Sequence, residues 1–277
     1  MPISRSRKQG TNPPAAASGA RFVWPMVLIC ALALLAVVVI ALPASVAMRF
    51  LPASVGAEDF SGSLWHGAAG SVTWNTRRVG AIEWRLHPGS LLQFVVAADL
   101  HWVKGGFLAD GTADFSSRGL VLHQVQGGGP IEDLRDLGLA DGWRGSANFN
   151  FSELGLAFAR APNGAAITSA VGVLNVSNLA SAQLAGGADL GGYALHAANA
   201  AIAPGAGVVA DLQDTGGPLE VQATIRFSAD RRTGMLSGTV KARDGAPPAL
   251  TRQLDDLAQL HARDALGRIP VDVEFTL

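Results

Sequence analysis

The sequence predicts a mainly β protein, with a single N-terminal transmembrane helix followed by a large, mostly antiparallel, curved β-sheet domain with one or two short helices. Three observations lead to this fold class. One long apolar stretch without charges lies near the N-terminus, and after residue 60 apolar and polar residues alternate with a period of two. The chain also contains 33 glycines, many of them between the alternating runs, as is typical of turns.

The uncharged stretch extends from Phe22 to Met48. Because about 20 apolar residues cross a hydrocarbon core, residues 22–48 are predicted to form a transmembrane signal anchor. Four basic residues precede it: Arg5, Arg7, Lys8 and Arg21. The positive-inside rule then keeps the N-terminus in the cytoplasm. Residues 1–21 are accordingly expected to be a disordered basic cytoplasmic tail, and residues 49–277 a periplasmic β-rich domain.

A cleaved signal peptide is the alternative, since Ser45, Val46 and Ala47 resemble a small-x-small cleavage site. The apolar stretch is longer than the usual ~7–15 residues of such a signal, and both interpretations export the rest of the chain. Beyond the tail, 17 basic residues face 22 acidic ones, a net charge of −5. This balance argues against nucleic acid as a partner. Apolar residues make up 49% of the chain, which excludes a disordered protein.

The exported part contains runs in which every second residue is apolar, and about a dozen strands are expected. The clearest runs are Ile82–Leu86, Phe94–Val103, Trp143–Phe151, Val221–Phe227 and Ile269–Leu277. Glycine clusters predict turns between strands. These clusters are Gly105-Gly106, Gly127–Gly129, Gly186-Gly187 and Gly216-Gly217.

Two helices are predicted outside the membrane. Pro130–Leu137 begins with proline and two carboxylates, which suits a helix N-terminus, and Ala249–Arg263 has apolar residues at helical spacing. The segment Arg160–Ser169 has the composition of a linker. It is either a lobe boundary near 160–170 or, as we favour, a loop within one continuous sheet.

Catalytic motifs are missing from the sequence, so no catalytic, cofactor-binding or metal-binding residue is predicted and the chain is not expected to be an enzyme. Asp99 and His101 share one strand face and could form an acid–base pair, although a solvent-exposed polar face is the simpler interpretation. Glu132, Asp133 and Asp136 are interpreted as charges at a helix start, with a metal site as the alternative.

Several short motifs occur in a fixed order: GSLWHG at 62–67, IEWRLHPGSLL at 82–92, GWRG at 142–145, LGGY at 190–193, DTGGPL at 214–219, LSG at 236–238, and Arg243. Together they resemble the type II secretion system protein N family over nearly all of residues 22–277. The residues of these motifs are candidates for structural or interaction roles. They are Gly62, Leu64, Trp65, Gly67, Trp84, Pro88, Trp143, Gly145, Tyr193, Gly216, Gly217 and Pro218.

The resemblance implies a single-pass protein of the bacterial inner membrane with its C-terminal domain in the periplasm. It also implies an accessory, non-enzymatic role in the export of folded proteins. The implied partners are other type II secretion components, on the inner-membrane platform or on the outer-membrane secretin side. One alternative is a periplasmic lipid- or amphiphile-binding or bridging module, whose one-sided strands form an open groove. A hydrolase with an unrecognised site near Asp99 and His101 is a third hypothesis.

Overall fold

The computed structural model describes residues 34, 37–38, 41–50, 54–116, 119–137, 139, 141–158, 165–199, 207–227 and 233–276. The chain divides into two compact units, residues 1–42 and 43–277. The predicted tail, most of the predicted membrane span, and residues 160–164 of the linker-like segment lie outside the described residues. In the first unit Leu34, Val37 and Val38 are helical, and their side chains are exposed. No helix within the described ranges is both long enough and apolar enough to cross a bilayer.

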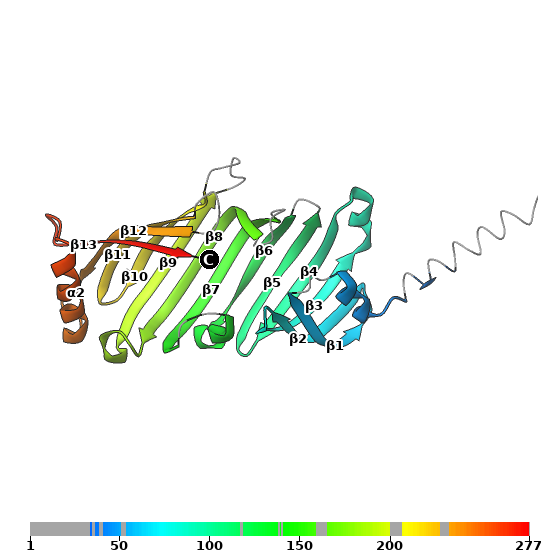
Figure 1. Cartoon of the computed structure of the whole chain (residues 1–277), viewed down its shortest axis with the longest axis horizontal. Helices are drawn as coiled ribbons and strands as arrows, with labels where there is room; N and C mark the ends of the chain where they lie inside the picture. Colours follow the sequence, from blue (N-terminus) through cyan, green and yellow to red (C-terminus); the bar gives the residue numbers. More distant parts are fainter. Residues whose placement is uncertain are drawn as a thin grey trace, which may run out of the picture. The chain divides into compact units, whose positions relative to one another are not determined.

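The described part of residues 43–277 is built on one antiparallel sheet of thirteen strands in chain order (Figure 1). The strands are β1 (Val55–Gly62), β2 (His66–Trp74), β3 (Arg77–His87), β4 (Val96–Lys104), β5 (Phe107–Ser116), β6 (Gly119–Pro130), β7 (Trp143–Phe158), β8 (Ala165–Ser181), β9 (Asp189–Asn199), β10 (Val209–Gly216), β11 (Leu219–Phe227), β12 (Thr233–Ala242) and β13 (Ile269–Thr276). The prediction of a mainly antiparallel β protein is therefore confirmed. The pairing of β7 with β8 continues to Phe158 and Ala165, so residues 165–169 of the linker-like segment belong to β8.

Short helices connect or cover the strands. They are the 3-10 helices η1 (Ala44–Phe50), η2 (Pro88–Gln93), η3 (Ile131–Leu137) and η4 (Ala185–Gly187), and the α-helix α2 (Pro248–Leu260). Both predicted helices are present. The first begins one residue later than expected, because Pro130 still pairs with Ser146 as the last residue of β6. In α2, Leu250 and Leu254 are buried, as the helical spacing of the apolar residues predicts.

The sheet has one apolar face that continues across twelve strands. Residues that lie directly opposite each other form a row without a single polar side chain: Ala69, Ile82, Trp102, Ala109, Gly127, Phe149, Leu174, Leu195, Leu212, Ala223, Gly238 and Val271. The neighbouring row, which begins with Ala68, Glu83, His101 and Asp110, faces the other way and is mostly polar. Period-two alternation thus gives the sheet two chemically different faces.

Only parts of the apolar face are covered. The helix η3 covers a cluster around Phe107, Ile131 and Ala147, and α2 places Leu250 against Leu190. A third cluster contains Ala170, Ala197, Val208 and Ala210. Few large side chains are fully enclosed: within the described ranges, Ile269 is the one large apolar residue less than 2% exposed. A single sheet with small helices does not enclose its apolar face as a second sheet would.

The predicted turn at Gly127–Gly129 is wrong, because all three glycines lie inside β6. At these positions glycine allows neighbouring strands to lie closer together than a residue with a side chain would permit. A Cβ at Gly127 would lie 2.3 Å from the carbonyl oxygen of Leu108, and one at Gly129 would lie 2.5 Å from Cα of Phe107. The predicted turns at Gly105-Gly106, Gly186-Gly187 and Gly216-Gly217 do connect strands, although Gly216 is also the last residue of β10.

The predicted strand Phe94–Val103 begins two residues later than expected, at Val96. Phe94 ends η2 in a left-handed conformation, with φ 58° and ψ 28°. Its amide N–H bonds back to Leu91, and its side chain is 94% exposed. The capping of η2 therefore takes Phe94 out of the strand and away from the apolar face.

Candidate functional site

The glycine–tryptophan motif at residues 62–67 forms the turn between β1 and β2. Gly62 adopts φ 80°, a conformation that favours glycine. The indole N–H of Trp84 donates a hydrogen bond to the carbonyl oxygen of Leu64 at 2.9 Å. A Cβ on Gly67 would lie 2.5 Å from the Trp84 ring, so this glycine lets the indole lie against the turn. The first motif and Trp84 are therefore parts of one packed unit.

Two further motif residues are Trp65, within the turn between β1 and β2, and Pro88, which follows β3. The carbonyl oxygen of Trp65 accepts a hydrogen bond from the Leu86 amide at 2.8 Å, which ties the turn to β3. Pro88 is the first residue of η2, where its fixed φ favours a helical start. The structure thus brings Gly62, Leu64, Trp65, Gly67, Trp84 and Pro88 to the N-terminal end of the sheet.

An apolar groove with a volume of about 620 Å³ lies on the apolar face at the N-terminal end of the sheet. Fourteen residues of β1 to β5, the β1–β2 turn and η2 line it, and every one is Ala, Val, Leu, Ile, Phe or Trp. Trp84 forms part of its wall and contacts Phe60 edge-to-face, with ring centroids 6.3 Å apart. The groove is thus the uncovered N-terminal portion of the apolar face.

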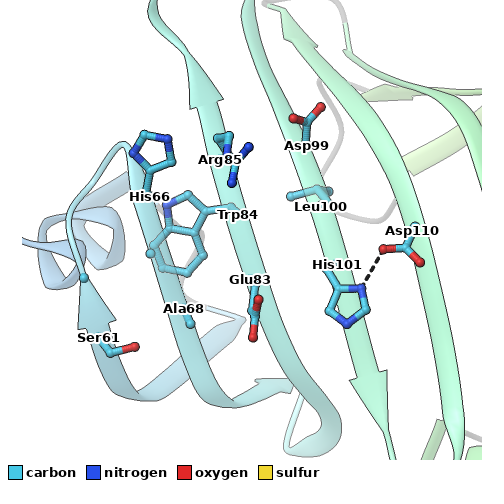
Figure 2. Close-up of a pocket in the computed structure, with 12 residues that line it drawn as sticks. Ser61, His66, Ala68, Glu83, Trp84, Arg85, Asp99, Leu100, His101 and Asp110 are labelled. Carbon is cyan, nitrogen blue, oxygen red and sulfur yellow. Dashed lines mark hydrogen bonds and ion pairs between the residues drawn. The ribbon is translucent and has the colours of Figure 1, made fainter.

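A polar hollow of about 490 Å³ lies over the same strands on their other face (Figure 2). Polar side chains of β3, β4 and β5 point into it, and Figure 2 shows them as Glu83, Arg85, Asp99, His101 and Asp110. Nδ1 of His101 lies 2.6 Å from Oδ1 of Asp110. Both side chains are more than a third exposed, so water screens this pair.

The acid–base pair of Asp99 with His101, the alternative to a solvent-exposed polar face, does not form. Each residue finds its partner on a neighbouring strand: Asp99 lies 2.9 Å from His87, and His101 pairs with Asp110. His101 lies directly opposite Asp110, and such residues are about 5 Å apart, whereas residues two apart on one strand are about 7 Å apart. His87 lies diagonally across from Asp99, since Arg85 is the residue directly opposite. The acid–base hypothesis therefore gains no support from the geometry.

Two acidic residues of η3, Asp133 and Asp136, each contact a different group near the turn between β4 and β5. Asp133 accepts a hydrogen bond from the Gly106 amide at 2.7 Å, which anchors η3 to the β4–β5 turn. Asp136 pairs with the buried Lys104 at 3.1 Å. In the part of the chain that the structure describes, no group of three His, Cys, Asp or Glu side chains is placed to hold a metal ion. These carboxylates thus fix a short helix over the sheet.

The remaining motif residues gather at the C-terminal half of the sheet. Gly217 approaches Gly191 so closely that a Cβ on Gly217 would lie 2.5 Å from Cα of Gly191. Gly216 has φ 131°, and Pro218 accepts a hydrogen bond from the Arg243 amide at 2.8 Å. Gly145 marks an irregularity where β7 pairs with β8. Trp143 contacts both the η3 cluster and the α2 cluster.

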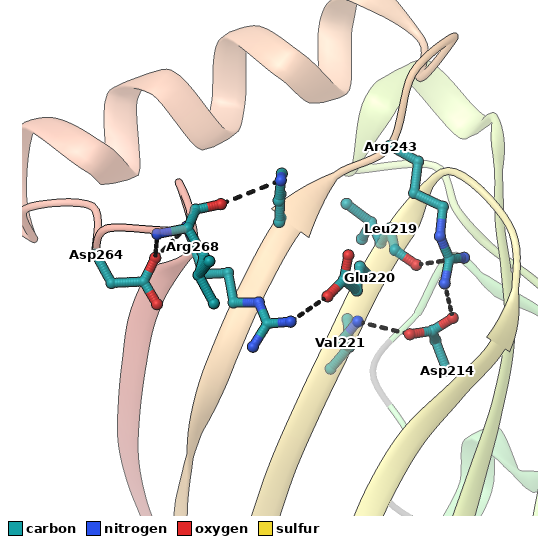
Figure 3. Close-up of polar contacts among 9 residues, drawn as sticks. Asp214, Leu219, Glu220, Val221, Arg243, Asp264 and Arg268 are labelled. Atoms are coloured by element: carbon teal, nitrogen blue, oxygen red, sulfur yellow. Dashed lines mark hydrogen bonds and ion pairs between the residues drawn. The ribbon is translucent and has the colours of Figure 1, made fainter.

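Arg243 is the centre of the polar contacts at this end (Figure 3). Its guanidinium donates to the carbonyl oxygens of Gly217 and Leu219 at 3.1 and 3.2 Å, and also to Asp214. Asp214 accepts a second hydrogen bond from the Val221 amide at 2.9 Å. Its side chain is only 9% exposed. Arg243 and Asp214 thus fasten the β10–β11 turn to the end of β12.

Tyr193, the one tyrosine of the chain, lies beside this network. Its hydroxyl donates to the carbonyl oxygen of Leu190 at 2.9 Å. Burial raises the pKa of Tyr193 to about 12, and the charges of Asp214 and Asp189 add to the rise, while Arg243 opposes it. The tyrosine therefore keeps its proton, and its hydrogen bond, well into the alkaline range.

We expect a single tyrosinate transition near pH 12 in the folded chain. The ordinary pKa of tyrosine is 10.0. Between pH 10 and 12 the unfolded chain loses this proton while the folded chain keeps it, so the free energy of unfolding falls as pH rises through this window. Absorbance at the tyrosinate band measures the transition, and Tyr193→Phe is the control without a signal. A midpoint near pH 10 in the folded chain would contradict the expectation.

The sequence suggested an open groove only as an alternative, and it indicated neither the position of the groove nor the walls that Leu91, Val96 and Phe115 contribute. The period-two pattern indicates which residues share a face, yet it does not show which part of that face a helix covers. The importance of Arg243 was visible only as one position of a motif. Its three partners lie 24 to 29 residues away in the sequence.

Comparison with known proteins gives matches to one family. A family model described as type II secretion system (T2SS), protein N, matches residues 53–272. A curated relative, type II secretion system protein N of Vibrio cholerae serotype O1, is 39% identical over 70 residues. That alignment covers 24% of this chain and 28% of the relative. No solved structure matches the chain.

Proposed function

The chain belongs to the type II secretion system protein N family, and from this premise we propose that it is an accessory, non-catalytic component of the type II secretion apparatus that assists the export of folded proteins. The observation that carries the proposal is the extent of the family match. It runs from residue 53 to residue 272 and so takes in nearly the whole sheet, from β1 to β13. Partners within the same apparatus follow from this role.

The proposed location is the bacterial inner membrane, with a single anchor in the apolar stretch of residues 22–48 that ends before η1, since η1 packs against β1 and β2. The sequence supports this topology, because the apolar stretch is long enough to cross a bilayer and four basic residues precede it. Residues 49–277 would then lie in the periplasm, with the sheet facing the other secretion components. A domain without cysteine suits that oxidising compartment.

The proposed mode of contact is addition of a partner strand to the free edge of β13. Within the described residues, β1 and β13 are the two strands with a single neighbour in the sheet. The edge of β1 is interrupted at Asp59, whose φ of 57° breaks the extended backbone, whereas β13 pairs with β12 without interruption over eight residues. An uninterrupted edge offers a row of backbone groups to a partner strand. The exposed carboxylates Asp272 and Glu274 favour a strand with basic residues.

Deletion of the gene is expected to lower the amount of type II cargo in the medium and to leave cargo in the periplasm. The measurement compares secreted and periplasmic proteins in the wild-type strain, the deletion strain, and a deletion strain that carries the gene on a plasmid. Complementation by the plasmid excludes effects on neighbouring genes. Normal secretion in the deletion strain would overturn the proposed role.

Photo-crosslinking tests the edge contact separately. A photoreactive residue at Glu274 of β13 is expected to capture another secretion component in living cells. The matched control is Glu58, an exposed glutamate on β1, the opposite edge strand. Equal capture from both positions, or capture from Glu58 alone, would exclude β13 as the contact edge. That outcome would leave the secretion role itself to be judged by the deletion experiment.

A further inference from the structure

The groove at the N-terminal end of the sheet has apolar walls, in which the indole N–H groups of Trp65 and Trp84 are the only side-chain hydrogen-bonding groups. None of its fourteen lining residues carries a charge, hydroxyl or amide in its side chain. The indole N–H of Trp84 already donates to Leu64. An occupant that enters the groove must therefore leave its polar groups outside, because a buried polar group without a partner is costly.

This chemistry disfavours a peptide as occupant. An extended strand would bring its own amide N–H groups into a space whose lining side chains include no hydrogen-bond acceptor. A helix satisfies its backbone internally, but it is about 10 Å wide, so 620 Å³ would hold only about five residues, little more than one turn. A hydrocarbon chain fits the groove better than either form of peptide, because it is narrow and has no polar atom along its length that would need a partner.

The position of the groove beside η1 points to the source of such a chain. The helix η1 packs against β1 and β2, and Pro43, just before it, pairs with Ser63 in the β1–β2 turn. Ser63 directly precedes Leu64 and Trp65, which line the groove. Both Pro43 and η1 up to Met48 belong to the apolar stretch predicted to span the membrane. The groove therefore lies beside the point where the chain is predicted to leave the bilayer.

Large apolar side chains are exposed along the rim of the groove. Leu91, Val96 and Phe115 line it and are nevertheless 44, 37 and 38% exposed. Phe94, which ends η2 two residues before Val96, is 94% exposed. Exposed apolar side chains in one cluster mark a binding surface, and aromatic rings are favoured where protein meets the lipid headgroups.

We propose that this groove binds an acyl chain of a membrane phospholipid. The acyl chain lies along the apolar face of β1 to β5, against Ile82, Leu86 and Ala98, and the headgroup stays outside in water. The groove volume is within the ~300–1,000 Å³ of small-molecule sites. Burial of methylene groups supplies the binding free energy. Lipid binding is independent of the contacts of β13 at the other edge of the sheet.

The test places a photoreactive benzoylphenylalanine at Leu86 in the full-length protein, reconstituted in vesicles of phosphatidylethanolamine and phosphatidylglycerol. The matched control is the same substitution at Arg85, the preceding residue of β3, which faces the polar hollow. Mass spectrometry of the irradiated protein measures phospholipid adducts. We expect at least about ten times more adduct at Leu86, because burial of a few methylene groups is sufficient for such a ratio.

A second pair of positions keeps the proposal testable if a variant at Leu86 or Arg85 does not fold. Val96 at the rim and its neighbour Ala97 on the other face are substituted in the same way, and an excess of phospholipid adduct at Val96 is again expected. Equal adduct yields at groove and control positions would overturn the proposal. So would adducts from the groove positions that contain a second copy of the chain or another protein instead of phospholipid.

Discussion

Replacement of Phe107 by alanine is expected to lower the free energy of unfolding by about 3–5 kcal/mol, the range for removal of a large buried aromatic side chain. Phe107 is 3% exposed and belongs to the cluster under η3. Its ring lies 5.5 Å from Trp102 and 6.1 Å from Phe149, measured between centroids. Alanine would leave a cavity where the apolar face is best covered, and the rigid sheet could close it only in part.

Urea unfolding of the full-length protein in detergent, followed by tryptophan fluorescence, measures this loss. Leu108→Ala is the matched control, because Leu108 follows Phe107 in β5, faces the other side and is 46% exposed. The control is expected to change the free energy of unfolding by less than about 1 kcal/mol. Losses of similar size for the two variants would show that η3 does not enclose a core.

Removal of the Arg243 guanidinium in Arg243→Leu is expected to cost about 2–3 kcal/mol. The variant leaves the carboxylate of Asp214, which is 9% exposed, without its cationic partner. Breaking a fully buried ion pair costs about 3–5 kcal/mol. Because the Arg243 side chain is 39% exposed, the expected cost lies at or below the lower end of that range. Because Arg243 lowers the pKa of Tyr193, its loss should also move the tyrosinate transition to higher pH.

The control for this variant is Arg263→Leu, which removes the arginine that pairs with Asp255. Both partners of that pair are about half exposed, so its loss is expected to cost less than about 1 kcal/mol. The same urea titration compares the two variants, and absorbance follows Tyr193. An Arg243→Leu protein as stable as the control, with an unchanged tyrosinate transition, would contradict the assigned role of Arg243.

Much of the fold could be predicted because alternation of residue types is a local property. In Ile269–Leu277 every second residue is apolar, and the run forms the strand β13 up to Thr276. Glycine was less informative, because it permits both a turn and close packing of two strands. At Gly105-Gly106 it makes a turn, whereas at Gly127 it leaves room for the ring of Phe149. Local sequence does not distinguish these two uses.

The candidate site was predictable only in part. The motif around Trp65 and the tryptophan at position 84 were singled out separately, and the structure joins them by the hydrogen bond from Trp84 to Leu64. The groove requires five strands and η2 together, so no single stretch of sequence contains its signal. The alternative of an acid–base pair between Asp99 and His101 is wrong for a related reason. Side chains on a strand meet those of the adjacent strands, and the register between strands lies outside local sequence.

The order of strands in the sheet has a consequence for how the protein is built. Every strand pairs only with the strands before and after it in the chain, so no pairing joins parts of the sequence that other strands separate. The N-terminal hairpins can therefore form while later residues are still being synthesised and exported. The connection from β12 to β13, residues 243–268, is the longest between neighbouring strands, and it contains α2. The edge proposed for partner binding is therefore completed last, so an unfinished chain does not present it.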